Sequence, residues 1–261
     1  MEKGRFFRHV RIILLLLLLI FIGLNTWLSQ QRHADWERRS QYAVIYPINA
    51  DRSASTATFM RNLQESDFDV IEKFMANQAN YYLVRQPRPI EVKLAPQVNE
   101  IPPPAPRKGN FLSQILWSLE MRYWAWSRNN YQGPLVDIKL YVIYHDPTIQ
   151  THLQHSLGIQ KGSYAVIHAF ADKRMSASNK FIITHEMLHI FGATDKYSLT
   201  TNQPKYPEGY AEPHKNPRLP QTRAEIMGGR IPISITESKI PKSLQQVLVG
   251  RPTAREINWV R

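Results

Sequence analysis

Cysteine is absent from this sequence of 261 residues. Its absence excludes disulfide bonds, thiolate metal sites and catalysis by a cysteine nucleophile. Any bound metal must therefore be held by histidine, aspartate, glutamate or tyrosine. A chain of this length can bury a full hydrophobic core, so it does not depend on disulfides for stability. The composition, 43% hydrophobic and 21% charged, is typical of globular proteins and excludes a disordered chain.

Acidic residues are few compared with basic ones. The 33 Lys and Arg residues outnumber the 21 Asp and Glu residues, which gives a formal net charge of +12 at pH 7. Such an excess can indicate nucleic acid, anionic lipid or an acidic polymer as a partner. Here the basic residues are spread along the chain without a dense cluster or a nucleic-acid-binding motif. We therefore expect a basic surface and no nucleic-acid partner.

A long apolar run occurs near the N-terminus. Residues 12–24 read IILLLLLLIFIGL and contain no charge, and basic residues precede them. A basic segment followed by an apolar one is typical of a signal peptide or a signal anchor. The apolar stretch continues more weakly to residue 28, which brings it to the lower limit for crossing a bilayer core.

Two interpretations of this segment compete. A cleaved signal peptide needs small residues at a cleavage site, and residues 25–30 (NTWLSQ) offer a poor one. An uncleaved anchor is therefore favoured. It predicts a cytoplasmic tail and transmembrane helix over residues 1–28, a stalk over 29–40 and one catalytic domain over 41–261. The protein would be a single-pass membrane protein with an extracytoplasmic domain, periplasmic or extracellular.

Strands and helices are expected to alternate in the rest of the chain. β-branched and aromatic residues predict strands at 42–48, 90–94, 136–144 and 164–170. One helical stretch, or two consecutive helices, is expected over about 56–80. A further helix carries apolar residues at helical spacing, and we expect this stripe to be core: Leu112, Ile115, Leu116, Leu119, Tyr123 and Trp126. The alternation indicates an α/β or α+β fold.

The most specific motif lies at residues 184–195, which read THEMLHIFGATD. Ser178 predicts the start of a helix through this segment. His185 and His189 are four residues apart and share one helix face, where two imidazoles can reach one metal ion. Glu186 can take a proton from a metal-bound water. This is the H-E-x-x-H arrangement of zinc hydrolases. The alternative is a buried helix with merely hydrogen-bonded histidines, in which Glu186 would be costly without a polar partner.

The third ligand is expected just after this helix. Gly192 can adopt the left-handed conformation that ends a helix. A sharp turn there can return the Asp195 carboxylate to the metal and leave the fourth position for water. The alternatives are Glu208, Glu212 and His214 in the segment YPEGYAEPHKNP. Its proline and glycine residues argue against a second helix, so Asp195 is favoured.

His185, Glu186, His189 and Gly192 match position by position the H-E-x-x-H-x-x-G-x-x-H pattern of the metzincin clan of zinc peptidases, which the sequence therefore resembles. Asp195 stands at the place of the third histidine, as in the bacterial snapalysin-like members. The resemblance covers about 45 residues with specific motifs. It implies an α/β (α+β) fold with a twisted mixed sheet, a backing helix and an active-site helix.

The clan also has a methionine turn beneath the metal, and Met227 in AEIMGG is the candidate for it. The clan's tyrosine two residues after that methionine is absent, because Gly229 stands there. Tyr197 and Tyr210 are the candidates for its role. The resemblance further implies an edge strand that binds substrate in extended form, and residues 164–170 are expected to be that edge.

These residues predict a membrane-anchored zinc metallopeptidase, an endopeptidase acting on a peptide or protein substrate. Zinc (Zn2+) would be held by His185, His189 and Asp195, and Glu186 would be the general base. The alternative is a non-catalytic, zinc-stabilised module that binds peptides or the cell wall at the membrane. Glu186 favours the enzyme, because a structural zinc site needs no base.

Overall fold

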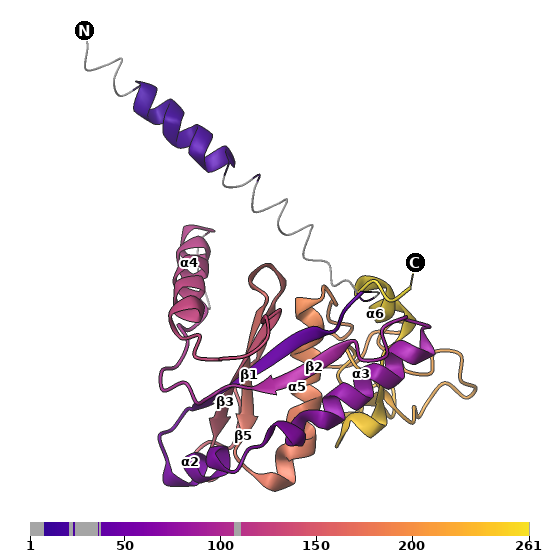
Figure 1. Cartoon of the computed structure of the whole chain (residues 1–261). Coiled ribbons are helices and arrows are strands. Elements are labelled where there is room, and N and C mark those ends of the chain that lie inside the picture. The colour runs from indigo at the N-terminus through magenta and orange to yellow at the C-terminus, as the bar shows by residue number, and fades with distance from the viewer. Residues whose placement is uncertain (1–7, 21–22, 24–35, 37, 107–110, 261) are drawn as a thin grey trace. The chain divides into compact units, whose positions relative to one another are not determined.

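A computed structural model describes residues 8–20, 23, 36, 38–106 and 111–260 of the chain (Figure 1). The chain divides into two units, Met1–Ala34 and Asp35–Arg261. The second unit contains the sheet and all residues of the predicted metal site.

The structure contradicts the predicted membrane anchor and the single-pass, extracytoplasmic localisation that followed from it. No helix in the described part of the chain is both long and apolar enough to cross a bilayer. The described helical stretch at residues 8–20 is shorter than the roughly 20 residues that a bilayer core requires. Residues 21–22 and 24–28 of the predicted anchor, and residues 29–35 and 37 of the predicted stalk, lie outside the described residues.

A five-stranded sheet with strand order β2-β1-β3-β5-β4 forms the centre of the second unit (Figure 1). The strands are β1 (Gln41–Asn49), β2 (Ile90–Leu94), β3 (Ile138–His145), β4 (Leu157–Ile159) and β5 (Tyr164–Phe170). The strands β2, β1, β3 and β5 pair in parallel with one another in this order, whereas β4 pairs antiparallel with β5. The sheet is therefore mixed, and the predicted α/β class with a mixed sheet is confirmed.

Residues 164–170 form a strand, but the prediction that they form the edge of the sheet is wrong. β5 lies between β3 and β4 and pairs with both. The edge is the three-residue strand β4, with the sequence LGI. Three residues with a central glycine are too few to show the alternation by which strands are recognised in a sequence.

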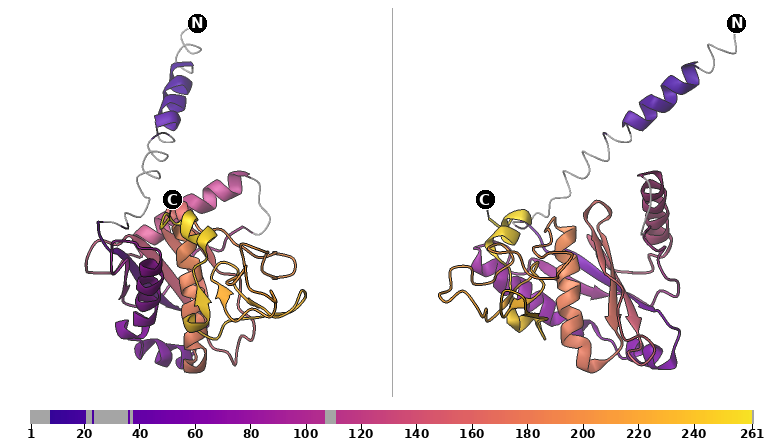
Figure 2. Two further views of the ribbon diagram at one scale, coloured as in Figure 1. Left: turned by 90° about the vertical axis from the view of Figure 1, so that its right-hand side faces the viewer. Right: turned by 180° about the vertical axis from the view of Figure 1, so that it is seen from behind.

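Helices α2 (Ala54–Arg61), α3 (Asp69–Tyr81) and α5 (Ser176–Ile190) lie on one face of the sheet (Figure 2). α3 contacts β2, and α5 contacts β3, β4 and β5. A 3-10 turn at Glu65–Phe68 separates α2 from α3, so the helical stretch expected over 56–80 is two helices.

Helix α4 (Phe111–Ser127) packs on the opposite face through its last turns only. Met121 and Trp124 are buried there, with the Trp124 ring 4.8 Å from that of Tyr141. The stripe that was predicted to be core is exposed instead, and Figure 1 shows α4 projecting from the sheet. The helix is apolar on more than one side, and helical spacing alone does not tell which side packs.

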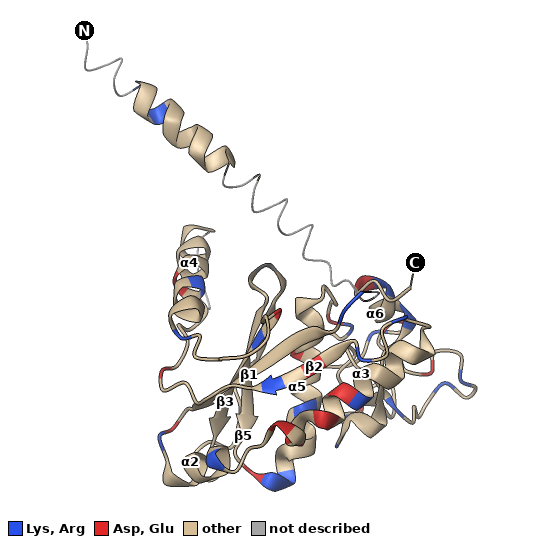
Figure 3. Cartoon of the chain, in the orientation of Figure 1, with Lys and Arg blue, Asp and Glu red and all other residues tan. Residues whose placement is uncertain are grey.

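The segment after α5 has few regular elements. It contains two short strand pairs, β6 (Ala224–Glu225) with β9 (Val247–Leu248) and β7 (Ile231–Pro232) with β8 (Ser238–Lys239), followed by α6 (Arg251–Glu256). Figure 3 shows Lys and Arg spread over strands, helices and loops.

An aromatic cluster ties both ends of the second unit to the end of α5. The ring of Trp36 packs against Phe191 and Trp259, and its Nε1 donates to the main-chain oxygen of Ile257. The segment next to α6 is thereby held beside the residue that follows α5. This contact places the C-terminal part of the chain near the predicted metal ligands.

Candidate metal centre

Helix α5 carries the two histidines of the predicted site. It begins at Ser176, two residues before the expected start at Ser178. A 3-10 turn at Lys173–Met175 leads into it, and the Asp172 side chain caps that turn by accepting from the Arg174 N–H. The prediction of the start was wrong because this preceding turn supplies the cap.

The two imidazoles are each oriented by one main-chain oxygen. His185 Nδ1 lies 2.8 Å from the oxygen of Ile226, and His189 Nδ1 lies 2.8 Å from the oxygen of Ala193. A carbonyl oxygen can only accept, so each Nδ1 carries the hydrogen. In the neutral rings the lone pair is then on Nε2, the atom free to bind a metal.

The turn after α5 gives Ala193 its place. Gly192 has φ +101°, in the left-handed region. Its N–H donates to the oxygen of His189, and the Ala193 N–H donates to the oxygen of Leu188. These two bonds form the Schellman motif that ends many helices. The same turn directs the Ala193 oxygen to His189 and sends the chain back toward the helix face.

Asp195 meets both histidines as a result of this turn. Its Oδ1 lies 3.2 Å from His185 Nε2 and 3.3 Å from His189 Nε2. The three ligand atoms all lie within 4.8 Å of one another, and the cluster could hold a metal ion. Two ligands about 2.0–2.1 Å from a tetrahedrally bound metal ion are roughly 3.3 Å apart, which is close to both distances from Asp195 Oδ1.

The chemistry of Asp195 Oδ1 supports the same conclusion. This atom is buried and has no hydrogen bond of acceptable geometry, although two imidazole nitrogens face it. Burial raises the pKa of Asp195, whereas protonation of the two imidazoles would hold it below its usual range. With both imidazoles neutral, Oδ1 faces two nitrogen lone pairs, and a metal ion between these three atoms would satisfy all of them.

Glu186 is buried between the cluster and the edge strand. The Gly158 N–H on β4 lies near its carboxylate and favours the charged form. Burial raises the pKa of Glu186, whereas His185 and His189 act in the opposite direction. Gly158 itself has no space for a side chain, since a Cβ there would lie 2.5 Å from the main-chain oxygen of Glu186 and 2.6 Å from the Cβ of His189. Glycine is required at this contact between the strand and α5.

The loop with the candidate methionine supports the first histidine. Met227 is fully buried, and its neighbour Ile226 supplies the oxygen that binds His185. Gly229 has φ +73°, and a Cβ there would meet the Tyr197 ring at 3.7 Å. The Tyr197 ring therefore lies beside Gly229, the position at which the metzincin pattern has its tyrosine.

The two candidate tyrosines differ in their surroundings. The ring centroid of Tyr197 is 6.4 Å from that of His185, and its hydroxyl lies near the Asp195 carboxylate. Burial, followed by the nearby Asp195 charge, raises the pKa of Tyr197 to about 12. The ring of Tyr210 instead packs against Tyr206, 5.4 Å away. The structure therefore brings only Tyr197 of these two to the cluster.

The alternative third ligands do not join the cluster. Glu208 and His214 are exposed, and the Glu212 carboxylate accepts from the N–H and hydroxyl of Thr222. Within the described residues, the group His185, His189 and Asp195 is the set of three or more such side chains close enough to share a metal. The geometry agrees with the sequence-based preference for Asp195.

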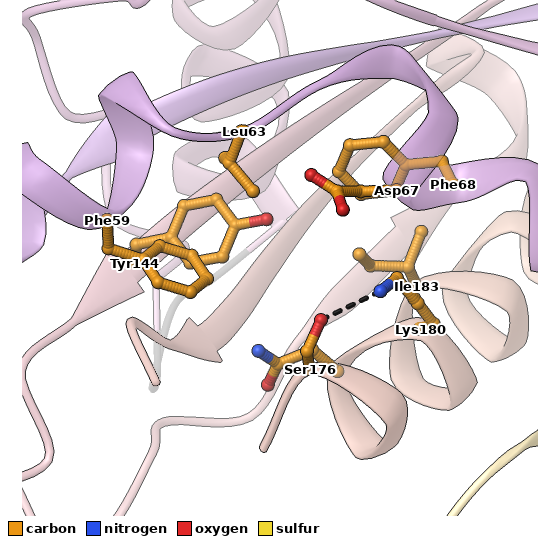
Figure 4. A pocket seen from close by; sticks show the side chains of 9 residues that line it. Phe59, Leu63, Asp67, Phe68, Tyr144, Ser176, Lys180 and Ile183 are labelled. Carbon is orange, nitrogen blue, oxygen red and sulfur yellow. Dashed lines mark hydrogen bonds between the residues drawn. The ribbon is translucent and has the colours of Figure 1, made fainter. Parts of the chain in front are cut away.

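A pocket formed by α2, the following 3-10 turn and the first turns of α5 is separate from this cluster (Figure 4). Lys180 Nζ donates to Ser176 Oγ there at 2.7 Å. The other lining residues are mainly apolar: Phe59, Leu63, Asp67, Phe68, Tyr144, Asn179 and Ile183. No ligand of the cluster lines this pocket.

Several residues around the cluster were missed from the sequence. Gly158 lies in a strand too short to recognise, Glu225 in a strand of two residues and Glu256 at the end of a helix of six residues, so no sequence pattern marks them. The one available hint was that Glu225 stands two positions before the candidate methionine Met227, and without the fold this does not indicate a role for Glu225.

Comparison with known proteins adds no family. No family model matches the chain, and no curated protein matches it. The resemblance to metzincins therefore depends on the motif and on the geometry described above.

Proposed function

We propose that the protein is a zinc-dependent endopeptidase. The observation that carries the proposal is a buried carboxylate, Glu186, directly beside a cluster of His185, His189 and Asp195 that could hold a metal ion. A structural metal site has no use for a buried acid that is not a ligand. The position of Glu186 next to the cluster is that of a general base.

The proposed chemistry is hydrolysis of an amide bond. When bound, zinc polarises the scissile carbonyl and lowers the pKa of its water toward neutrality. Glu186 accepts one proton from the attacking water and passes it to the leaving amine nitrogen, while the carbonyl carbon gains a bond to oxygen and loses its bond to nitrogen. The Tyr197 hydroxyl, protonated because of its raised pKa, can donate to the oxyanion that develops.

The edge strand β4 supports a peptide as substrate. β4 pairs with β5 on one side, and its Gly158 lies against Glu186 on α5. An extended peptide that adds to the free side of β4 would form main-chain hydrogen bonds. It would pass beside the general base, which is the position that cleavage of a peptide bond requires.

The test is a peptide-library digest by the purified protein, with zinc content measured before and after treatment with a chelator. We expect one zinc per chain, cleavage that stops on chelation and recovery on adding zinc. Bound zinc without cleavage of any peptide would favour the non-catalytic binding module. Absence of zinc from a folded protein supplied with zinc would contradict the metal site itself.

A further inference from the structure

Two carboxylates outside the ligand set connect the C-terminal helix α6 to the loops that carry the metal cluster. Glu256 is the last residue of α6. Glu225 lies on β6, just before the loop of Met227, and reaches the start of α6. Neither carboxylate is part of the ligand cluster, and the proposed mechanism uses neither.

Glu256 fixes both residues that flank Asp195. Its carboxylate accepts from the Thr194 N–H at 2.9 Å and from the Thr194 hydroxyl at 2.7 Å. It also pairs with the Lys196 ammonium at 2.6 Å. The Lys196 side chain is 2% exposed and that of Glu256 is 31% exposed, so the ammonium is shielded from water while the carboxylate is partly exposed. Charge-assisted hydrogen bonds of this kind are the stronger ones in proteins.

The Asp195 loop is also tied to the methionine loop. The Lys196 N–H donates to the oxygen of Met227 at 2.8 Å. The Lys196 ammonium donates in addition to the Thr194 oxygen at 3.0 Å. The position of Asp195 is therefore set by contacts on both of its sides.

Glu225 anchors the loop that orients His185. It is fully buried and accepts from the N–H groups of Met227 at 2.7 Å and Gly228 at 2.8 Å. Its other oxygen accepts from the Gly250 N–H at 3.0 Å and the Thr253 hydroxyl at 2.7 Å, both at the start of α6. One carboxylate thus joins α6 to the loop whose Ile226 oxygen holds His185.

A buried carboxylate is costly unless it is well hydrogen-bonded. Burial raises the pKa of Glu225, and hydrogen bonds from Thr253, Gly250 and Gly228 act against this by favouring the charged form. The donors of Gly250 and Thr253 are available only when α6 is in place. Docking of α6 and the geometry of the two ligand-bearing loops are therefore one cooperative unit.

We propose that α6 clamps the metal site together, with Glu256 and Glu225 as positioning residues for Asp195 and His185. Zinc affinity then depends on the docking of α6, although α6 supplies no ligand. The inference rests on the proposed metal site. Its structural part, the ordering of the Asp195 loop by α6, can be measured without zinc.

The test compares Glu256→Gln with wild type and with Glu237→Gln, which changes an exposed glutamate of the same C-terminal segment. The measurements are zinc affinity, by competition with a chromophoric chelator, and amide hydrogen exchange of residues 193–197 in the zinc-free protein. We expect Glu256→Gln to bind zinc about 10- to 100-fold more weakly, as for other groups that orient ligands. Exchange of these amides should be faster, while Glu237→Gln should match wild type in both measurements.

Thr194→Val is the second variant, since it removes one hydrogen bond to Glu256 and leaves no buried charge unpaired. We expect a smaller change in the same direction, about threefold in zinc affinity. If Glu256→Gln does not fold, Thr194→Val decides. Wild-type zinc affinity and wild-type exchange in the folded variants would overturn the clamp. A wild-type protein that takes up no zinc would contradict the proposed function, and the exchange measurement would then decide the clamp alone.

Discussion

The imidazole of His185 is held by the main-chain oxygen of Ile226, 41 residues later in the chain and 2.8 Å from Nδ1. The oxygen fixes both the ring and its tautomer, so Nε2 faces His189 and Asp195 with a free lone pair. The metal site is therefore preorganised by the loop after β6, and its ligands need little rearrangement to bind an ion.

The first prediction is that His185→Ala and His189→Ala each abolish tight zinc binding, because two remaining ligands do not form a catalytic zinc site. Zinc content after dialysis against a weak chelator is the measurement. His214→Ala serves as the control, since His214 is exposed and outside the cluster. Equal zinc stoichiometry in all four proteins would show that the ligand assignment is wrong.

The ligand cluster could be predicted from sequence because its determinants are local. His185 and His189 share a helix face, and Gly192 reverses the chain within three residues of Asp195. Strands 90–94 and 164–170 were also predicted at the residues where they occur, since β-branched and aromatic residues mark buried strands.

What could not be predicted depends on contacts between distant segments. Glu256 meets Thr194 across 62 residues, and nothing in either local sequence indicates the pair. The edge strand β4 is recognisable only by its partner β5. The apolar stripe of α4 was wrongly predicted to be core, because spacing identifies an apolar face and tertiary packing decides which face is covered.

A second prediction concerns the close contact between β4 and α5. Gly158→Ala should destabilise the fold by about 1–3 kcal/mol, since its Cβ would overlap the backbone of Glu186 and the Cβ of His189. Zinc affinity should fall as well, because the histidine moves with the helix. The neighbouring Leu157 is 40% exposed, so Leu157→Ala should lower the free energy of unfolding by less than about 1 kcal/mol. Urea unfolding and zinc titration of both variants are the measurements, and similar values for the two would contradict the packing argument.

The third prediction is a loss of stability in mild acid caused by a second histidine pair. His145 Nε2 and His168 Nδ1 lie 2.9 Å apart on β3 and β5. Burial lowers the pKa of both rings, that of His168 to about 4 with His145 adding to the effect. Both rings have folded pKa values below the unfolded value of about 6.5. The folded state is therefore not destabilised by these histidines above about pH 6.5, where both rings are neutral in either state. As the pH falls toward 4, the unfolded chain takes up protons on these histidines more readily than the folded one, so the free energy of unfolding decreases.

Urea unfolding at several pH values between 7 and 4 tests this prediction. In His168→Gln the loss of stability over this range should be smaller than in wild type by roughly 1–2 kcal/mol, after allowance for partial exposure. His155→Gln is the control, because His155 is exposed. Parallel curves for His168→Gln and wild type would assign the acid sensitivity to other groups.

The fourth prediction separates the two tyrosines. Tyr197→Phe removes a hydroxyl beside Asp195 and should lower kcat about 100- to 1,000-fold while zinc stays bound, since one donor to the oxyanion is lost. Tyr210→Phe should leave kcat near the wild-type value, because its ring packs on Tyr206 instead. Steady-state kinetics on a peptide found by the library digest decide between them. Equal kcat values would remove Tyr197 from the mechanism.

The last prediction distinguishes catalysis from metal binding. Glu186→Gln keeps the size of the side chain and an oxygen that can accept from the Gly158 N–H, but it cannot take up a proton. Zinc content and thermal unfolding should therefore stay close to wild type. Peptide hydrolysis should fall about 100- to 10,000-fold, the range typical of losing general acid–base catalysis.

Glu208→Gln is the matched control, since Glu208 is an exposed glutamate that was weighed as a ligand. It should change neither zinc content nor turnover. Turnover by Glu186→Gln at the wild-type rate would show that another group moves the proton. Loss of zinc from Glu186→Gln would instead make Glu186 part of the metal site, because a general base that is not a ligand can be neutralised without releasing the ion.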